Sequence, residues 1–278
     1  MSRLLKRAAE LGIVRTVVVV SPGIHPEVEE ALEARYGLAE AVVADDGPGA
    51  AGAAYLESVL TGGERIGISP WSQTLLSVVE HMRPLRVAGA DSVVQLIGGL
   101  GVTSAQARAN RLLDHLAQML GATATFVPAP GLAGSRQIRD GLLAEPAMEA
   151  ITAEWASLTM VLVGIGRLPP SEFLRQSGNA VGPADQAALR AAGAVGDVCH
   201  RFFDAAGEAV PNDLDNRVIG IDQSALRAVP RRIGLAGGPE KRDAIRAALL
   251  GGWVNVLITD LATAQSLLEP PPSDRPPR

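Results

Sequence analysis

The chain has 278 residues, of which 47% are hydrophobic and 20% charged, with a net charge of -5 and an isoelectric point of about 5.5. These values are typical of a globular protein of one large or two small domains, and the negative charge argues against nucleic-acid binding by its main body. No apolar run is long enough to span a bilayer, and a single cysteine, Cys199, excludes an internal disulfide framework, so we expect a cytoplasmic protein.

The N-terminal stretch "MSRLLKRAAELG" carries charges throughout its apolar pattern, so it is not a signal peptide. Leucine and alanine at helical spacing predict a helix over 2–11, and the β-branched run "IVRTVVVV" predicts a buried strand over 13–20. A second helix is expected over 25–37, with Pro26 at its start and Gly37 just past its end.

Predicted strands and helices alternate along the rest of the chain. The expected strands cover 65–69, 91–99, 122–130, 158–166, 231–238 and 254–260. The expected helices cover 70–82, 100–121 after a loop, 137–156 with an interruption near Pro146, 183–193, 239–250 and 260–268. Turn signals within 194–212 predict a small antiparallel excursion there, and the sequence has no internal repeat. This alternation predicts an α/β fold with a mostly parallel sheet flanked by helices.

Ligands of such sheets bind beyond the carboxyl ends of the strands. Four loops follow predicted strands at that edge, and all are rich in glycine or hydroxyl groups. They are Ser69–Thr74, Gly98–Thr103, Gly164–Arg167 and Gly237–Lys241.

The last of these loops contains an unusual lysine. The chain has 23 arginines but only two lysines, Lys6 and Lys241. Gly237 and Gly238 let the backbone approach a ligand closely, and the next amides begin a helix, where an anion is favoured and a lysine alone is not. A phosphate bound by Lys241 would resolve that conflict. The alternative is that neighbouring carboxylates neutralise the turn and Lys241 is solvated.

The other polar groups have two interpretations each. Ser69, Ser72 and Thr74 could hold a phosphate or sugar hydroxyls, or the serines could cap the following helix. "GLGVTS" is a near miss to a dinucleotide motif and is weak evidence. Asp197, which follows a glycine in an apolar stretch, is either a buried cap or an acceptor for a sugar hydroxyl. The four histidines are scattered, so we expect no metal site, and nothing in the sequence calls for a cofactor.

Several blocks of the sequence together resemble the SorC family of sugar-responsive bacterial transcription regulators, also called the SorC/DeoR type. They include "SRLLKRAAELGIVR", "IGISPWSQTL", "VVQLIGGLG", "VPAPG", "VLVGIG", "GAVGDVCHRFFDAAG", "NRVIGI" and "AGGPEKRDAIRAALLGGWVNVLITDLATAQSLL". The resemblance implies an effector domain with the fold of ribose-5-phosphate isomerase, glucosamine-6-phosphate deaminase and the CoA transferases. It implies a ligand site made by Ser69, Ser72, Thr74, Gly98, Gly99, Gln106, Asp197, Gly237, Gly238 and Lys241, with Lys241 on a phosphate and Asp197 on the sugar.

Two departures from the family pattern reduce the range of ligands that we expect. The family usually reads serine-tryptophan-glycine-arginine-threonine where this chain has residues 69–74, and a polar or basic residue is common where Ile97 stands. Both changes remove contacts for an anion. A sugar monophosphate, a free sugar or a polyol therefore fits better than a bisphosphate.

The resemblance also predicts the domain organisation. Residues 1–15 resemble only the recognition helix of a helix-turn-helix domain, with Arg3, Lys6 and Arg7 as remnants of a DNA-binding surface. We expect the effector domain over 16–269 and a disordered proline-rich tail over 270–278. The expected protein is a homo-oligomer without enzymatic activity, and it would bind operator DNA only if the missing helices are present. The alternative is a sugar-phosphate isomerase or deaminase of the same fold.

Overall fold

The computed structural model describes residues 23, 25–45, 47–85 and 87–270. Within these residues, seven strands form one sheet in the order β1-β10-β9-β5-β2-β3-β4, and every neighbouring pair is parallel. Its strands are β1 (Glu40–Ala44), β2 (Glu64–Ile68), β3 (Ala90–Gln95), β4 (Thr123–Thr125), β5 (Met160–Gly164), β9 (Arg231–Leu235) and β10 (Val256–Asp260). The predicted α/β class with a parallel sheet is confirmed.

Helices cover both faces of this sheet, because its central strands are apolar on both sides. In β5, Met160 and Leu162 pack into one core, whereas Val161 and Val163 pack into another. The first core is covered by α3 (Pro48–Val59), α4 (Gln73–His81) and α5 (Thr103–Leu120). The second is covered by α2 (Pro26–Tyr36), α7 (Pro146–Trp155), α10 (Gln223–Ala228), α11 (Arg242–Leu250) and α12 (Leu261–Leu268).

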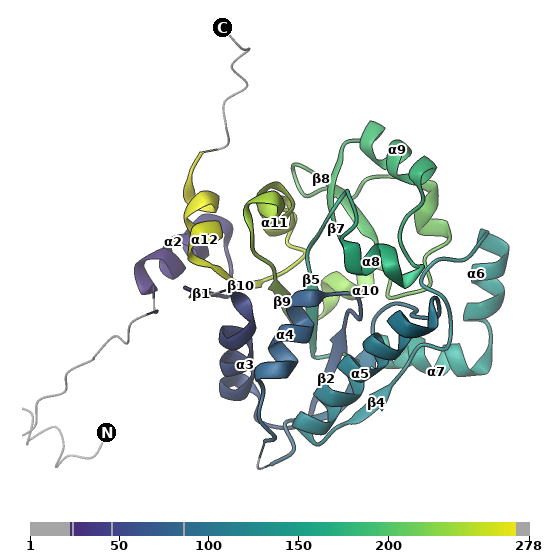
Figure 1. Ribbon diagram of the computed structural model, residues 1–278, viewed down its shortest axis with the longest axis horizontal. Coiled ribbons are helices and arrows are strands. Elements are labelled where there is room, and N and C mark those ends of the chain that lie inside the picture. The colour runs from purple at the N-terminus through teal and green to yellow at the C-terminus, as the bar shows by residue number, and fades with distance from the viewer. Residues whose placement is uncertain (1–22, 24, 46, 86, 271–278) are drawn as a thin grey trace, which may run out of the picture.

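A smaller unit packs at one end of the sheet (Figure 1). Three antiparallel strands form it, namely β6 (Gly166–Arg167), β7 (Ala194–Val198) and β8 (Arg201–Asp204). It carries α8 (Glu172–Ser177), α9 (Pro183–Ala191) and the 3-10 turn η1 (Asp213–Asn216), and it has its own small core. The predicted antiparallel excursion over 194–212 is therefore confirmed.

Several element boundaries differ from the predictions. The strand expected over 122–130 is only Thr123–Thr125, because Pro128 and Pro130 lack the amide hydrogen that a ladder needs. The helix expected over 137–156 is divided at Pro146 into α6 (Arg136–Leu143) and α7, as predicted. The helix expected over 239–250 begins with a 3-10 turn, η2 (Pro239–Lys241), before α11.

Several elements were not predicted, among them α10 and the 3-10 turn η1. β1 is short and α3 is rich in glycine and alanine, so neither shows a clear hydrophobic periodicity in the sequence. Helix α8 has only six residues, which is too few to show one. The predicted helix 2–11, the strand 13–20, the DNA-binding remnant Arg3, Lys6 and Arg7, and the tail from residue 271 lie outside the described residues. None of the helices in the described part of the chain is both long and apolar enough to cross a membrane.

Candidate functional site

A cavity of about 410 Å³ lies at the carboxyl edge of the sheet, at the point where the order in which strands are added changes from one side to the other. After β2 the chain adds strands on one side, and from β5 onward it adds them on the other, so the carboxyl ends of β2 and β5 mark the switch point. Ser69 follows β2, Gly164 ends β5 and Ile97 follows β3, and all three line the cavity. The volume is within the range of small-molecule sites.

The small antiparallel sheet brings Asp197 into this cavity. Gly166 in β6 pairs with Asp197 in β7, and a Cβ on Gly166 would lie 2.1 Å from the Oδ1 of Asp197. Only glycine therefore leaves space for the carboxylate at this position. Asp197 accepts a hydrogen bond from the backbone N–H of His200 (3.0 Å), and burial raises the pKa of its carboxyl group.

The turn between β7 and β8 is strained. Val198 pairs with Arg201, which leaves a two-residue turn, and both turn residues have positive φ: 53° at Cys199 and 61° at His200. Glycine and asparagine are the residues that such turns favour, and other residues cost on the order of 1 kcal/mol or more each. Both residues line the cavity. Burial raises the pKa of the Cys199 thiol to about 12, so this cysteine is not a nucleophile at neutral pH.

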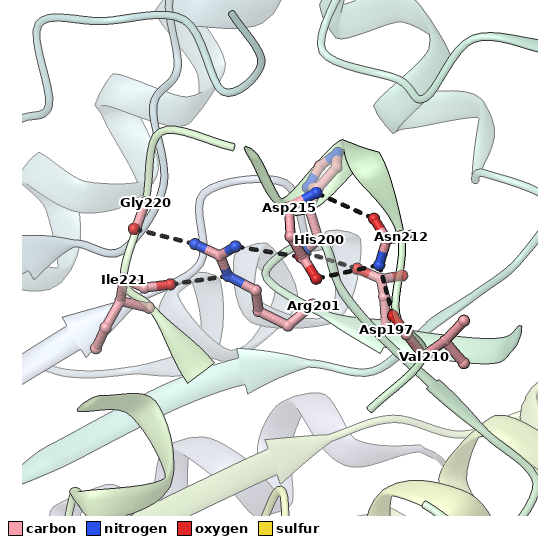
Figure 2. A network of polar contacts seen from close by, with 8 residues as sticks. All are labelled: Asp197, His200, Arg201, Val210, Asn212, Asp215, Gly220 and Ile221. Carbon is pink, nitrogen blue, oxygen red and sulfur yellow. Dashed lines mark hydrogen bonds and ion pairs between the residues drawn. The ribbon is translucent and has the colours of Figure 1, made fainter. Parts of the chain in front are cut away.

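Arg201, the first residue after this turn, bonds the hairpin to a neighbouring segment (Figure 2). Its guanidinium is buried and donates to the carbonyl of Ile221 (3.1 Å), to that of Gly220 (3.4 Å) and to the carboxylate of Asp215 (3.2 Å). Asn212 in turn donates to the second oxygen of Asp215 (3.1 Å). These bonds fix the hairpin against the 210–221 segment and so fix the position of Asp197.

Lys241 supplies a cation to the cavity. It is the N-cap residue of α11, at the end of η2, and its side chain lines the cavity. Burial lowers the pKa of its ammonium group, while the carboxylates of Glu240 and Asp197 act in the opposite direction and the guanidinium of Arg167 adds to the lowering. Arg167 lines the same cavity. Lys241 and Arg167 are thus two cations of the lining beside the carboxylates of Asp197 and Glu240, a mixed set that suits a ligand with one anionic group and several hydroxyl groups.

The predicted hydroxyl groups line the cavity but also have structural partners. Ser69 Oγ accepts from the amide of Gly164 (3.2 Å), and Ser72 Oγ accepts from the amide of Leu75 (3.2 Å) as the N-cap of α4. Thr74 also lines the cavity. Each serine hydroxyl can still donate its own hydrogen to a ligand, so the capping interpretation of Ser72 is realised without excluding a ligand contact.

Five predicted site residues lie outside the cavity lining, namely Gly98, Gly99, Gln106, Gly237 and Gly238. The amide of Gly238 donates to the side chains of Asp260 (3.1 Å) and Thr263 (2.9 Å), so that amide stabilises the start of α12. A Cβ on Gly98 would lie 2.2 Å from the carbonyl oxygen of Pro130, so that glycine is needed for loop packing. Gln106 is half-buried on α5.

Several lining residues were not predicted. Trp71, Arg167 and His200 line the cavity, as do residues of α8 including Glu172 and Arg175, which pair with each other. Arg167 stands directly after a glycine-rich strand end, which is a signal that sequence reasoning could have used. No local signal marks α8, because its place at the cavity depends on the fold of the 168–182 segment.

Two further features of the described residues limit what the molecule can bind. A second hollow of about 420 Å³ lies between α7 and α10 near the starts of β5 and β9, and its lining contains no charged side chain. In the part of the chain that the structure describes, no group of three or more His, Cys, Asp or Glu side chains is placed to hold a metal ion. The first cavity is therefore the candidate site.

Comparisons with known proteins agree on the class of this chain. Residues 25–269 match a family model described as "Putative sugar-binding domain". The chain is 32% identical over 282 residues to the sorbitol operon regulator of Klebsiella pneumoniae, covering 96% of this chain and 88% of that protein. It is 30% identical over 277 residues to the deoxyribonucleoside regulator of Bacillus subtilis, covering 96% and 87% of the two chains.

Solved structures give the same picture. The crystal structure of the full-length sorbitol operon regulator SorC of Klebsiella pneumoniae matches with a TM-score of 0.81 at 30% identity, covering 96% of this chain and 88% of that one. The "putative sugar-binding domain" of a DeoR regulator from Pseudomonas syringae pv. tomato matches with a TM-score of 0.69 at 33% identity, covering 88% and 99%.

Proposed function

Because this chain belongs to the family of sugar-binding domains found in SorC- and DeoR-type transcriptional regulators, we propose that its cavity at the carboxyl edge of the sheet binds the effector of such a regulator. The observation that carries the proposal is the convergence of Asp197 and Lys241, 44 positions apart in the sequence, on one cavity at the switch point. A carboxylate suits sugar hydroxyls and an ammonium suits a phosphate.

The proposed effector is a sugar monophosphate, a free sugar or a polyol. Ile97 contributes an apolar side chain to the lining, where the resembled family often has a polar or basic residue. The cations of the lining are the half-buried Lys241, the exposed Arg167, and Arg175, whose guanidinium already pairs with Glu172. This supports one phosphate group at most, as opposed to a bisphosphate.

The proposed mode of action is a population shift. An effector that binds one conformation of a homo-oligomer more tightly than another shifts the balance between them, and operator DNA binding changes with that balance. The names of the relatives, which concern sorbitol and deoxyribonucleosides, support a carbohydrate effector of this kind.

A thermal-shift screen tests the proposal. The panel contains sorbitol, sorbitol 6-phosphate, 2-deoxyribose 5-phosphate and inorganic phosphate. A compound that binds only the folded state adds about 2.7 kcal/mol of stability at a hundredfold excess over its Kd, which raises the melting temperature by several degrees. We expect at least one carbohydrate to do so more strongly than inorganic phosphate. If no carbohydrate stabilises the protein, the cavity is not an effector site for this class.

A further inference from the structure

Helix α8 lines the cavity but makes few bonds to its surroundings. Among the described residues, the side-chain hydrogen bonds of its first turns stay within the segment: Ser171 caps Leu174, Glu172 pairs with Arg175, and Arg175 donates to the carbonyl of Pro170. Such a segment opens at a lower free energy than one bonded to the core. Besides its packing on α5, its position over the cavity depends on how its C-terminal end is anchored.

The anchor is a buried polar cluster at the C-terminal end of α8 and just beyond it. Ser177 and Asn179 are 0% and 2% exposed. The carbonyl of Ser177 accepts from the amide of Val102 (3.0 Å), and the Oδ1 of Asn179 accepts from the amide of Gly131 (2.8 Å). The third bond joins the Nε2 of His200 to the carbonyl of Asn179 (3.0 Å), so His200 carries the hydrogen on Nε2 and donates it.

His200 is therefore bonded in two directions. Its backbone N–H donates to the carboxylate of Asp197, and its ring donates to the anchor of α8. The ring is buried, and its edge meets Phe202 at a centroid distance of 6.4 Å. A glycine or asparagine would suit its positive φ better. A histidine kept at this backbone cost indicates that the side chain itself has a role.

We infer that His200 is a positioning residue for effector binding, which ties the hairpin bearing Asp197 to the anchor of α8 so that these two parts of the cavity wall hold one arrangement. An effector held by Asp197 then fixes α8 through His200, and displacement of the hairpin loosens α8. This inference rests on the proposed function for its ligand. The link between the hairpin and α8 rests only on the two hydrogen bonds of His200.

The first arm of the test uses no small molecule. Hydrogen exchange is measured in wild type and in His200→Gly, His200→Gln and His115→Gln. Glycine relaxes the turn and deletes the ring, glutamine places an amide donor at a similar reach, and His115 is an exposed residue of α5 that serves as the matched control. We expect His200→Gly to exchange faster over both 194–204 and 172–180, with 40–59 unchanged. His200→Gln and His115→Gln should follow wild type.

The second arm measures affinity for sorbitol 6-phosphate by calorimetry. We expect His200→Gly to weaken binding on the order of tenfold, which corresponds to one lost hydrogen bond to a buried group, and His200→Gln to restore it. If His200→Gly does not fold, His200→Asn replaces it, because asparagine tolerates positive φ but is too short to reach Asn179.

Two outcomes overturn the inference. In one, His200→Gly changes exchange in the hairpin alone and leaves 172–180 as in wild type. In the other, His200→Gln behaves like His200→Gly, so that a donor at this position does not matter. If wild type does not bind sorbitol 6-phosphate, that result counts against the choice of effector, and the exchange arm still decides whether His200 links the two segments.

Discussion

At the scale of single residues, Lys241 has the clearest expected effect. Its ammonium group is partly buried in the cavity, and burial lowers its pKa. Lys241→Met keeps much of the apolar stem and removes the charge. We expect binding of a sugar monophosphate to weaken by roughly 2–4 kcal/mol, a factor of about 30 to 1,000. Titration calorimetry with sorbitol 6-phosphate measures this loss.

The control for Lys241 is the same titration with free sorbitol. If Lys241 contacts the phosphate, the variant loses its preference for the phosphorylated compound but not its affinity for the polyol. A variant that binds both compounds like wild type would show that Lys241 does not contact the phosphate, and would leave Asp197 as the main polar contact.

His200 predicts a pH dependence of stability. Burial lowers the pKa of its imidazole below the usual 6.5, with Arg201 acting in the same direction and Asp197 and the carbonyl of Asn179 opposing it. As the pH falls below 6.5, the unfolded chain binds a proton that the native ring resists, so stability falls by at most about 1.4 kcal/mol per pH unit. Urea unfolding at pH 7, 6 and 5 measures it.

The comparison that isolates His200 is with His200→Gln. Asp197 is present in both proteins, and because its pKa is raised, its native carboxyl takes up a proton first and opposes the loss of stability on acidification. We expect a shallower decline in the variant between pH 7 and 5. Parallel curves for the two proteins would show that this histidine does not contribute.

At the scale of elements, two serine caps allow the contribution of a hydroxyl to helix stability to be distinguished from its contribution to ligand binding. Ser72 caps α4 and lines the cavity. Ser135 caps α6 in the same way, its Oγ accepting from the amide of Ile138, but lies outside the cavity lining. Replacing either by alanine removes one cap, which costs about 1 kcal/mol. We expect similar losses of stability in chemical denaturation. Only Ser72→Ala should also weaken binding of sorbitol 6-phosphate.

The result that decides this comparison is the affinity of Ser72→Ala. Equal affinities in both variants would mean that the hydroxyl of Ser72 serves the helix alone. Of the two interpretations that the sequence leaves open for Ser72, helix capping alone would then hold. Thr74 and Ser69 would remain as predicted hydroxyl groups that line the cavity.

At the scale of the whole molecule, the prediction is the absence of turnover. The relatives are transcriptional regulators, yet Asp197, His200 and Lys241 line one cavity and are groups that an isomerase or deaminase could use. We expect incubation with pentose and hexose phosphates to give neither isomerisation nor ammonia. Turnover on the order of 10 per second, an ordinary enzyme rate, would make a purely regulatory role untenable.

The sequence alone determined the class of fold and the edge that carries the site. Alternating strand and helix patterns specify a parallel sheet because each buried strand needs helices on both faces, and parallel strands place their carboxyl ends together. Ser69, Ser72, Thr74, Asp197 and Lys241 were predicted as site residues, and the structure brings these five to one cavity. Their role in binding remains a prediction.

Tertiary structure decided which glycines and polar groups face that cavity. Gly238 follows a strand at the correct edge, but its amide donates to Asp260 and Thr263, the N-cap and a first-turn residue of α12, which lie 22 and 25 residues later. His200 reaches the cavity through a strained two-residue turn that no local sequence pattern indicates. Sequence patterns report the periodicity of each element, whereas the direction of a side chain at the end of a strand depends on contacts between segments distant in the chain.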